Sequence, residues 1–341
     1  MREFFESIMP NVIPKLPALW NATLETLAMT GLSALYILVI GMALGILLTV
    51  TKKGGLMQNT AVYRVLDIII NLLRSVPFII LLFLLIPLGY CLYCSLWRCD
   101  YMDFTRYVGF DNYLDVLHDK NVIRSLGLSF VISFSSLAIA LVLGVLLALW
   151  INSAKSGFAY ALEIMILVPW VTSQVVAAML WKWLLKDETG LLNYVFSKLG
   201  LGTVGFLSNK NIAVISLIGV ITWRVIGYVM VQMVAGLKAI PKEYDEAAMI
   251  DGANKWQMFW KVRLPQLKTP MALSAIIVAL SNLNNLTVPL TLTGGGPGKA
   301  TTVISILAYR ESFSYYHFGE ASAMSIVLCL INFVLTVMYV K

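Results

Sequence analysis

The chain has 341 residues, of which 59% are hydrophobic and 13% are charged, and its mean hydropathy is +0.82. Soluble domains carry about 25% charged residues, so this composition excludes a soluble protein and indicates one that crosses a membrane many times. The net charge of +7 fits lysines and arginines at cytoplasmic headgroups and does not require nucleic acid as a partner. Four cysteines and two histidines predict neither a disulfide framework nor a histidine-rich metal site.

Long apolar stretches predict the membrane-spanning helices. A span needs about 20 mostly apolar residues, and roughly seven stretches meet this criterion: 24–50, 66–96, 124–151, 159–185, 212–237, 269–291 and 320–340. An odd number of spans places the two ends of the chain on opposite sides of the membrane. We expect no cleavable signal, because the first twenty residues contain glutamates and prolines and no long apolar region.

A polar, charged segment at residues 240–265, named the coupling loop below, separates the fifth stretch from the sixth. Its local signals predict two short helices joined by a turn. Gly252 can adopt the left-handed conformation that ends a helix. Asn254 can cap a second helix from Lys255 to Leu264, and Pro265 is expected to end that helix.

The coupling loop also contains a spaced set of residues: Glu246, Ala247, Ala248, Asp251, Gly252, Ala253, Phe259, Leu264 and Pro265. In this spacing it resembles the EAA loop of the membrane subunits of ATP-binding-cassette (ABC) importers. The resemblance implies a cytoplasmic helix that docks into a groove of the ATPase subunit and carries its motion to the membrane. An ordinary amphipathic loop is the alternative, but it predicts no particular Ala-Ala and Asp-Gly-Ala spacing.

The orientation of the chain follows from this loop. If the coupling loop is cytoplasmic, the segments 51–65 and 152–158 are cytoplasmic too, and 97–123, 186–211 and 292–319 lie outside. Lysines and arginines are about equally numerous on the two sides, so their total does not decide the orientation. Lysines and arginines are denser in the shorter inner segments, and this density modestly favours the orientation with the coupling loop in the cytoplasm.

From about residue 86 onward, four marks stand in order: Val108–Tyr113, Pro169-Trp170, Gly190–Tyr194 and the glycine-rich Leu292–Gly298. With them the chain resembles the first permease of carbohydrate-uptake systems of the maltose and glycerol-phosphate type. The resemblance implies an all-α membrane protein with the type I ABC importer fold, in the bacterial cytoplasmic membrane. It also implies three kinds of partner: a second sugar-type permease, two ATPase subunits and an extracellular solute-binding protein.

Residues 1–85 show a different pattern. Thr23–Thr30, Gly41 with Gly45, and Asn71–Ile80 resemble permeases of the methionine and polar amino-acid type. The change falls near Ile86-Pro87, so we expect an N-terminal membrane segment, 1–85, followed by a sugar-type domain, 86–341. A natural recombinant and an engineered or assembled chimera both explain this change. An amino-acid importer subunit is the corresponding alternative function.

Polar residues inside predicted spans are costly in lipid and usually face a cavity. In the sixth span, Ser281, Asn284 and Asn285 stand three and four residues apart, which predicts one shared helix face, and Thr287 follows. We expect these residues to line the transport path. Hydrogen bonding between spans, at about 1 kcal/mol, is an equally weighted alternative.

Arg224 in the fifth span is a second candidate. A charge near mid-membrane costs at least ~2.5 kcal/mol, so Arg224 needs a cavity or a carboxylate. Trp223 beside it can stack on a sugar ring or hold the guanidinium. A substrate contact and a structural ion pair both fit these two residues.

No catalytic constellation is present in the sequence. The glycine-rich segment lacks the Gly-Lys-Ser/Thr ending of a phosphate-binding loop. We therefore expect ATP and Mg²⁺ to bind on the partner ATPase, and this chain to bind no cofactor or metal. A secondary transporter is a rival class, but it would need paired carboxylates in the membrane, and Glu163 is the only acid near a span interior in the sugar-type part.

Overall fold

The computed structural model describes residues 84–153 and 156–340 and, before residue 84, only scattered positions between 24 and 67. Contacts along the chain divide it into two compact units, Met1–Pro87 and Leu88–Lys341. The boundary lies beside Ile86-Pro87, where the sequence pattern changes. The predicted span 24–50 and most of 66–96 lie outside the described residues, and the amino-acid-permease character of residues 1–85 stays a prediction.

From residue 86 on, the described chain is helical apart from one short hairpin. Its elements are α5 (Ile86–Ser95), β1 (Trp97–Asp100), β2 (Asp103–Tyr107), α6 (Asp111–His118), α7 (Lys120–Ser153), α8 (Ser156–Val171), α9 (Gln174–Leu184), α10 (Leu191–Lys198), α11 (Lys210–Lys238), α12 (Lys242–Ile250), α13 (Lys255–Met258), the π-helix η3 (Phe259–Arg263), α14 (Leu264–Gln266), α15 (Lys268–Leu283), α16 (Thr287–Leu292), α17 (Ile304–Phe313) and α18 (Phe318–Val340). The antiparallel hairpin β1–β2 was not expected from the sequence.

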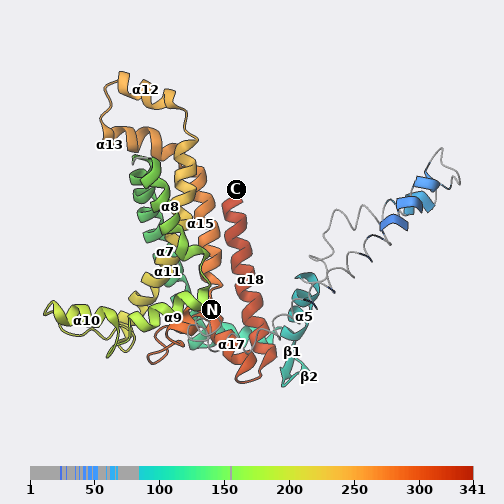
Figure 1. The fold of residues 1–341 in the computed structure, drawn as a ribbon. Coiled ribbons are helices and arrows are strands. Elements are labelled where there is room, and N and C mark those ends of the chain that lie inside the picture. The colour runs from blue at the N-terminus through green and yellow to red at the C-terminus, as the bar shows by residue number, and fades with distance from the viewer. Residues whose placement is uncertain are drawn as a thin grey trace, which may run out of the picture. The chain divides into compact units, whose positions relative to one another are not determined.

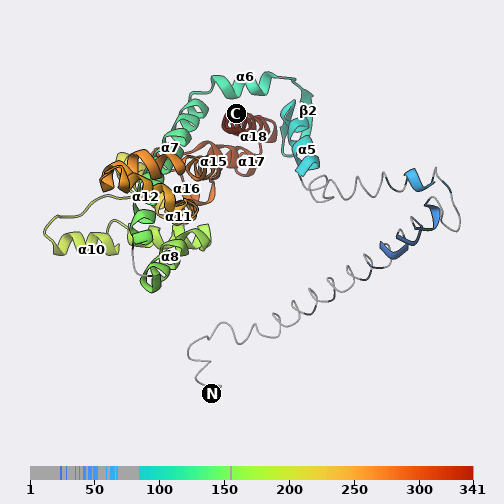
Figure 2. The same ribbon diagram turned by 90° about the horizontal axis from the view of Figure 1, so that it is seen from above.

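The axes of the long helices in the second unit are roughly aligned with one another, and short elements lie at both ends of these helices. In Figure 1, α12 and α13 lie at one end of α7, α8, α11 and α15, and α9, α10 and α17 lie at the other. Asn152 lines the same cavity as Asp245 and Arg263, so the α7–α8 turn and the coupling loop share an end. In Figure 2, α6 runs from the hairpin to α7, and α18 packs against α6, α15 and α17. This arrangement agrees with the predicted sidedness of the loops.

Three described helices, α7, α11 and α18, are long and apolar enough to cross a membrane. They confirm the spans predicted at 124–151, 212–237 and 320–340. Two bent helix pairs raise the number to five if each pair counts as one span, within the part of the chain that the structure describes.

The span predicted over 159–185 is not one continuous helix, because α8 and α9 meet at an angle of 98°. Pro169 lies inside α8 and removes a backbone donor near its end. Ser173 then takes an extended conformation, with φ −51° and ψ 133°. The chain turns there, and α9 packs against α16.

The continuous helix predicted over 269–291 is also interrupted. α15 ends at Leu283, and α16 begins at Thr287. Between them the buried side chain of Asn285 accepts a hydrogen bond of 3.0 Å from the N–H of Val288 and so caps the new helix. Pro289 lies in the first turn of α16, where a proline is tolerated, so the break precedes the proline.

The core of the bundle forms where α7 and α11 pack closely. A Cβ at Gly144 of α7 would lie 2.6 Å from Cγ1 of Val229, so only glycine allows this approach. Buried serines of α7 add polar contacts: Ser133 donates to Ala279 O (3.2 Å), and Ser136 accepts from Asn282 (3.0 Å). Small residues and hydrogen bonds of this kind hold helices together where lipid removes the hydrophobic drive.

Candidate functional site

The coupling loop has the two helices and the turn that its sequence predicts. α12 spans Lys242–Ile250, and Gly252 has a φ of +75°. Asn254 caps α13 in a capping box, because its side chain accepts from Gln257 N (2.8 Å) and Gln257 returns a bond to Asn254 N (2.9 Å). Local chemistry therefore determines the shape of this loop.

The second helix of the loop continues further than predicted. Pro265 lies in the first turn of α14, and the helical run reaches Gln266 before it bends by 62° into α15. The π-helix η3 explains why Pro265 does not stop it. In this wider turn the N–H of Leu264 donates to Phe259 O. Pro265 comes directly after this bond, and it has no N–H of its own that would need a partner.

An ion pair joins the two halves of the coupling loop. Arg263 of η3 donates to both carboxylate oxygens of Asp245 in α12, at 2.8 and 3.3 Å. Phe259 packs against the hydrophobic core formed mainly by α7 and α11. Phe259 thus attaches the second half of the loop to the bundle, and the ion pair attaches α12 to that second half.

The helix α12 has no buried residue, and three of its large apolar side chains are exposed. Ile250 is 86% exposed, and Tyr244 and Met249 are also exposed. Trp256 at the start of α13 is 70% exposed. Exposed apolar side chains that lie together can form a site of contact with a protein or with a membrane.

The structure brings the predicted coupling residues together in this projecting loop. Glu246, Ala247, Asp251, Gly252 and Pro265 are exposed, and Ala248, Ala253, Phe259 and Leu264 are partly buried. A Cβ added at Gly252 would meet nothing within 4 Å, so this glycine is required by its backbone conformation and not by space.

Arg224 lies in the middle of α11 and is 7% exposed. Its Nη2 donates to Trp170 O over 3.4 Å, and its Nε has no partner among the described residues. Trp170 lies in the last turn of α8, where carbonyl groups lack helical partners and a cation is favoured. The ring of neighbouring Trp223 instead contacts Trp181, with centroids 5.4 Å apart.

The polar residues of the sixth predicted span do not share one helix face. Asn284 and Asn285 lie beyond the end of α15, at the break, and Thr287 begins α16. Asn284 is exposed and accepts a hydrogen bond of 3.0 Å from Asn332 of α18, a partner that the sequence did not identify. Ser281 is partly buried in α15. The residues nevertheless gather around one interruption in the bundle.

The glycine-rich segment forms a compact turn at the end opposite the coupling loop. Thr301 donates to Gly296 O (2.7 Å), Thr302 donates to Gly295 O (2.9 Å), and Arg310 donates to Gly294 O (2.6 Å). Gly294, Gly295 and Gly298 all have positive φ. The segment is therefore a structural turn that holds α17 in place.

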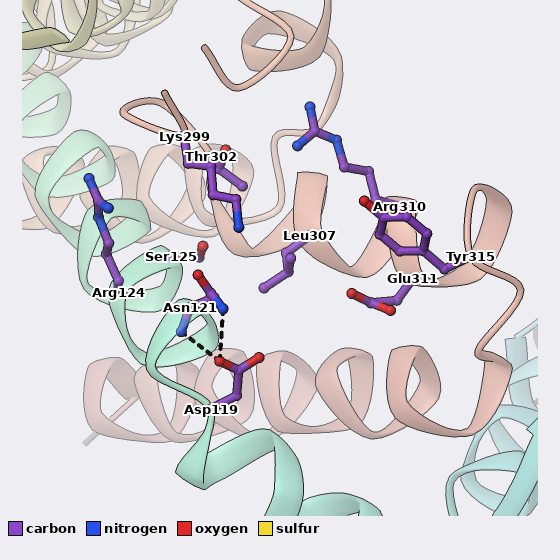
Figure 3. A pocket seen from close by; sticks show the side chains of 10 residues that line it. All are labelled: Asp119, Asn121, Arg124, Ser125, Lys299, Thr302, Leu307, Arg310, Glu311 and Tyr315. Carbon is purple, nitrogen blue, oxygen red and sulfur yellow. Dashed lines mark hydrogen bonds between the residues drawn. The ribbon is translucent and has the colours of Figure 1, made fainter. Parts of the chain in front are cut away.

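A small cavity of about 100 Å³ lies beside this turn. It is lined by Asp119, Asn121, Arg124, Ser125, Lys299, Thr302, Leu307, Arg310, Glu311 and Tyr315. Figure 3 shows Lys299, Asn121 and Glu311 pointing toward its middle. This cavity was not predicted from the sequence, because the residues that line it come from three separate segments.

Comparisons with known proteins agree with this geometry. The family described as "Binding-protein-dependent transport system inner membrane component" matches residues 140–340. The chain is 32% identical to the trehalose/maltose transport system permease protein MalF of Thermococcus litoralis, over 77% of this chain and 89% of that protein. It is 30% identical to the sn-glycerol-3-phosphate transport system permease protein UgpA of Agrobacterium fabrum, over 79% and 92%.

A solved structure shows the same fold. It is a chain of a bacterial alginate ABC transporter in complex with alginate pentasaccharide-bound periplasmic protein, with a TM-score of 0.69 and 25% identity. The match covers 80% of this chain and 92% of that chain. The chain therefore belongs to the family of binding-protein-dependent transport system inner membrane components and is a multi-pass permease subunit of an ABC importer in the cytoplasmic membrane.

Proposed function

We propose that this permease carries a carbohydrate, or glycerol phosphate, across the membrane by alternating access driven by ATP. The relatives named for trehalose/maltose and for glycerol-3-phosphate transport support this substrate class. The fold shared with an importer of the polysaccharide alginate supports it further.

The observation that carries the mechanism is the direct path from the coupling loop to the break in α15–α16. α13, η3 and α14 form one helical run that bends by 62° into α15. α12, with no buried residue, is joined to this run by the pair of Asp245 and Arg263. A protein that pushes on α12 therefore moves α15, at whose far end Asn284 and Asn285 lie.

The partners follow from the same mechanism. Two ATPase subunits bind ATP and Mg²⁺, and one of them docks on Glu246, Ala247, Ala248 and Gly252 of this chain. A second sugar-type permease completes the path, and an extracellular solute-binding protein delivers the substrate at the end that carries α17. This chain binds no cofactor or metal for transport itself.

The substrate path in this proposal runs past Ser281, Asn284, Asn285 and Thr287, with Trp223 and Arg224 on α11. Asn284 supports this role through its exposure, since its side chain lines an open groove of about 370 Å³ with residues of α17 and α18. Asn285 contributes by fixing the break, because its side chain is already used as a cap.

The test is uptake by the assembled transporter. The chain, its second permease and its ATPase are reconstituted in proteoliposomes with the solute-binding protein. Uptake of labelled maltose, glycerol phosphate and methionine is then compared with and without ATP. ATP-dependent uptake of either of the first two supports the proposal. Uptake of methionine alone would favour the amino-acid alternative, and uptake driven by a proton gradient without ATP would favour a secondary transporter.

A bulky residue at Ala248 tests the ATPase contact. Overfilling a packed contact costs about 1–3 kcal/mol, so Ala248→Trp should weaken ATPase binding roughly 5- to 150-fold and abolish uptake. The matched control is Leu199→Trp, which adds a similar ring to an exposed position after α10, at the opposite end. Normal ATPase retention and uptake in Ala248→Trp would contradict the coupling role of this loop.

A further inference from the structure

Three metal-ligating side chains converge at the corner between α17 and α18. Glu311 lies in the last turns of α17, His317 precedes α18, and Glu320 lies in its first turn. One oxygen of each glutamate and one ring nitrogen of the histidine all lie within 4.8 Å of one another. The corner lies at the end of the bundle opposite the coupling loop (Figure 1), outside every role assigned above.

The backbone fixes the positions of these three residues. The N–H of His317 donates to Glu311 O (2.8 Å), and the N–H of Ala321 donates to His317 O (3.1 Å), so the loop is tied to both helices. His317 also pairs with Asp100 of the hairpin in an antiparallel bridge. The ring of Tyr316 stacks on that of Tyr101, with centroids 5.0 Å apart. The three donors therefore stand on a rigid frame, as a metal site requires.

The charges at this corner favour a divalent cation. The two carboxylates carry two negative charges, and a proton on His317 compensates only one of them. Asp115 and Arg98 also act on Glu320, and their effects oppose each other. His317 Nδ1 already contacts Glu311 Oε2 at 3.1 Å. The two positive charges of a divalent ion balance those of the two carboxylates, and a neutral imidazole adds none. The ion and its three ligands together therefore carry no net charge.

The ligand set selects the class of metal. Mg²⁺ and Ca²⁺ prefer oxygen ligands alone, whereas one imidazole with carboxylates suits Zn²⁺ and similar transition metals. Zn²⁺ binds nitrogen and oxygen at about 2.0–2.2 Å, which puts tetrahedral ligands roughly 3.4 Å apart. The ligand atoms lie within 4.8 Å of one another, so the exposed ring of His317 and the partly buried Glu320 need to close by at most about 1.4 Å to reach this spacing. Water completes the fourth position.

We propose that Glu311, His317 and Glu320 form a Zn²⁺ site that pins the end of α17 to the start of α18. The proposal does not depend on the substrate or on the transport mechanism. It predicts one Zn²⁺ per chain and a more stable corner when the ion is bound.

The chain has two histidines, so His118 can serve as an internal control for His317. His118 is also exposed, but among the described residues its ring nitrogen Nδ1 contacts the carbonyl oxygen of Leu114 (2.7 Å) and no carboxylate. The full-length chain, purified without a histidine tag and stripped with EDTA, is treated with diethyl pyrocarbonate with and without equimolar ZnCl₂. Mass spectrometry then measures the modification of each histidine. Zn²⁺ should slow the modification of His317 at least tenfold and leave His118 unchanged.

Variants provide the second measurement. In calorimetric titrations with ZnCl₂, His317→Ala and Glu320→Gln should each weaken binding at least tenfold, and His118→Ala should bind as the native chain does. The melting temperatures without metal check that the variants fold. Equal protection of the two histidines, no saturable binding of Zn²⁺, or unchanged affinity in His317→Ala would each overturn the site.

Discussion

The pair of Asp245 and Arg263 is the described ion pair that connects α12 to the rest of the coupling loop, and its loss should loosen that helix. Both side chains are about 30% exposed, so the bonds are only partly desolvated. Exposed ion pairs contribute about 0.2–1 kcal/mol, and hydrogen bonds to charged groups contribute somewhat more. Because two bonds form here and α12 has no buried residue, we expect about 1 kcal/mol, which is roughly a fivefold change in the opening of α12.

Hydrogen exchange of the α12 amides measures this effect. Asp245→Ala and Arg263→Ala should each speed exchange of residues 242–250 about fivefold, and the double variant should be no faster than either single one. Lys255→Ala is the matched control, because it removes a cation from the exposed start of α13. Additive effects of the two substitutions, or exchange rates that do not change, would refute the claim that this pair holds α12.

Two further predictions concern packing in the membrane. Asn285→Leu removes the cap of α16 and leaves a buried N–H without a partner, so it should destabilise the chain by about 1–3 kcal/mol. Asn284→Leu removes the hydrogen bond to Asn332 and should cost about 0.6 kcal/mol. The melting temperatures of the two variants measure this difference. Gly227→Ala places a Cβ 2.2 Å from the backbone oxygen of Ile166, so α8 and α11 must separate. The matched control is Gly219→Ala, where the added Cβ has open space. We expect a lower melting temperature for Gly227→Ala than for this control.

The parts of the fold that the sequence predicts well are those determined by local chemistry. Gly252 and Asn254 predict the turn and the second helix of the coupling loop, because a left-handed glycine and a capping side chain act within a few residues. The spans of α7, α11 and α18 follow from apolar length alone. The coupling role of the residues in this loop remains a prediction, since their partner is another chain.

The parts that the sequence does not predict depend on direction or on distant partners. Hydropathy counts apolar residues but does not reveal that the chain turns by 98° after Pro169. In the same way, the apolar run over 269–291 hides the break that Asn285 caps. The bond between Asn284 and Asn332 joins residues 48 positions apart, so spacing within one span could not identify it.

Arg224 gives the sharpest test of the transport path. Its guanidinium makes one long hydrogen bond, its Nε has no partner, and no ion pair to it occurs among the described residues. A buried cation that its own chain satisfies so poorly does not contribute to stability, because its desolvation is not repaid. Its remaining donors are free for a substrate hydroxyl or phosphate, or for water in an open path.

Replacing this arginine should therefore separate stability from transport. Arg224→Met keeps an unbranched apolar chain as far as the position of Nε and removes the charge. The melting temperature of the purified chain should therefore stay equal or rise, while uptake by the reconstituted transporter should fall at least tenfold. The matched control is Thr222→Val, which removes another buried polar atom without a partner two positions away on α11 and should leave uptake unchanged. A melting temperature that falls by several degrees, with loss of the assembled complex, would show instead that Arg224 holds α8 and α11 together through the carbonyl of Trp170.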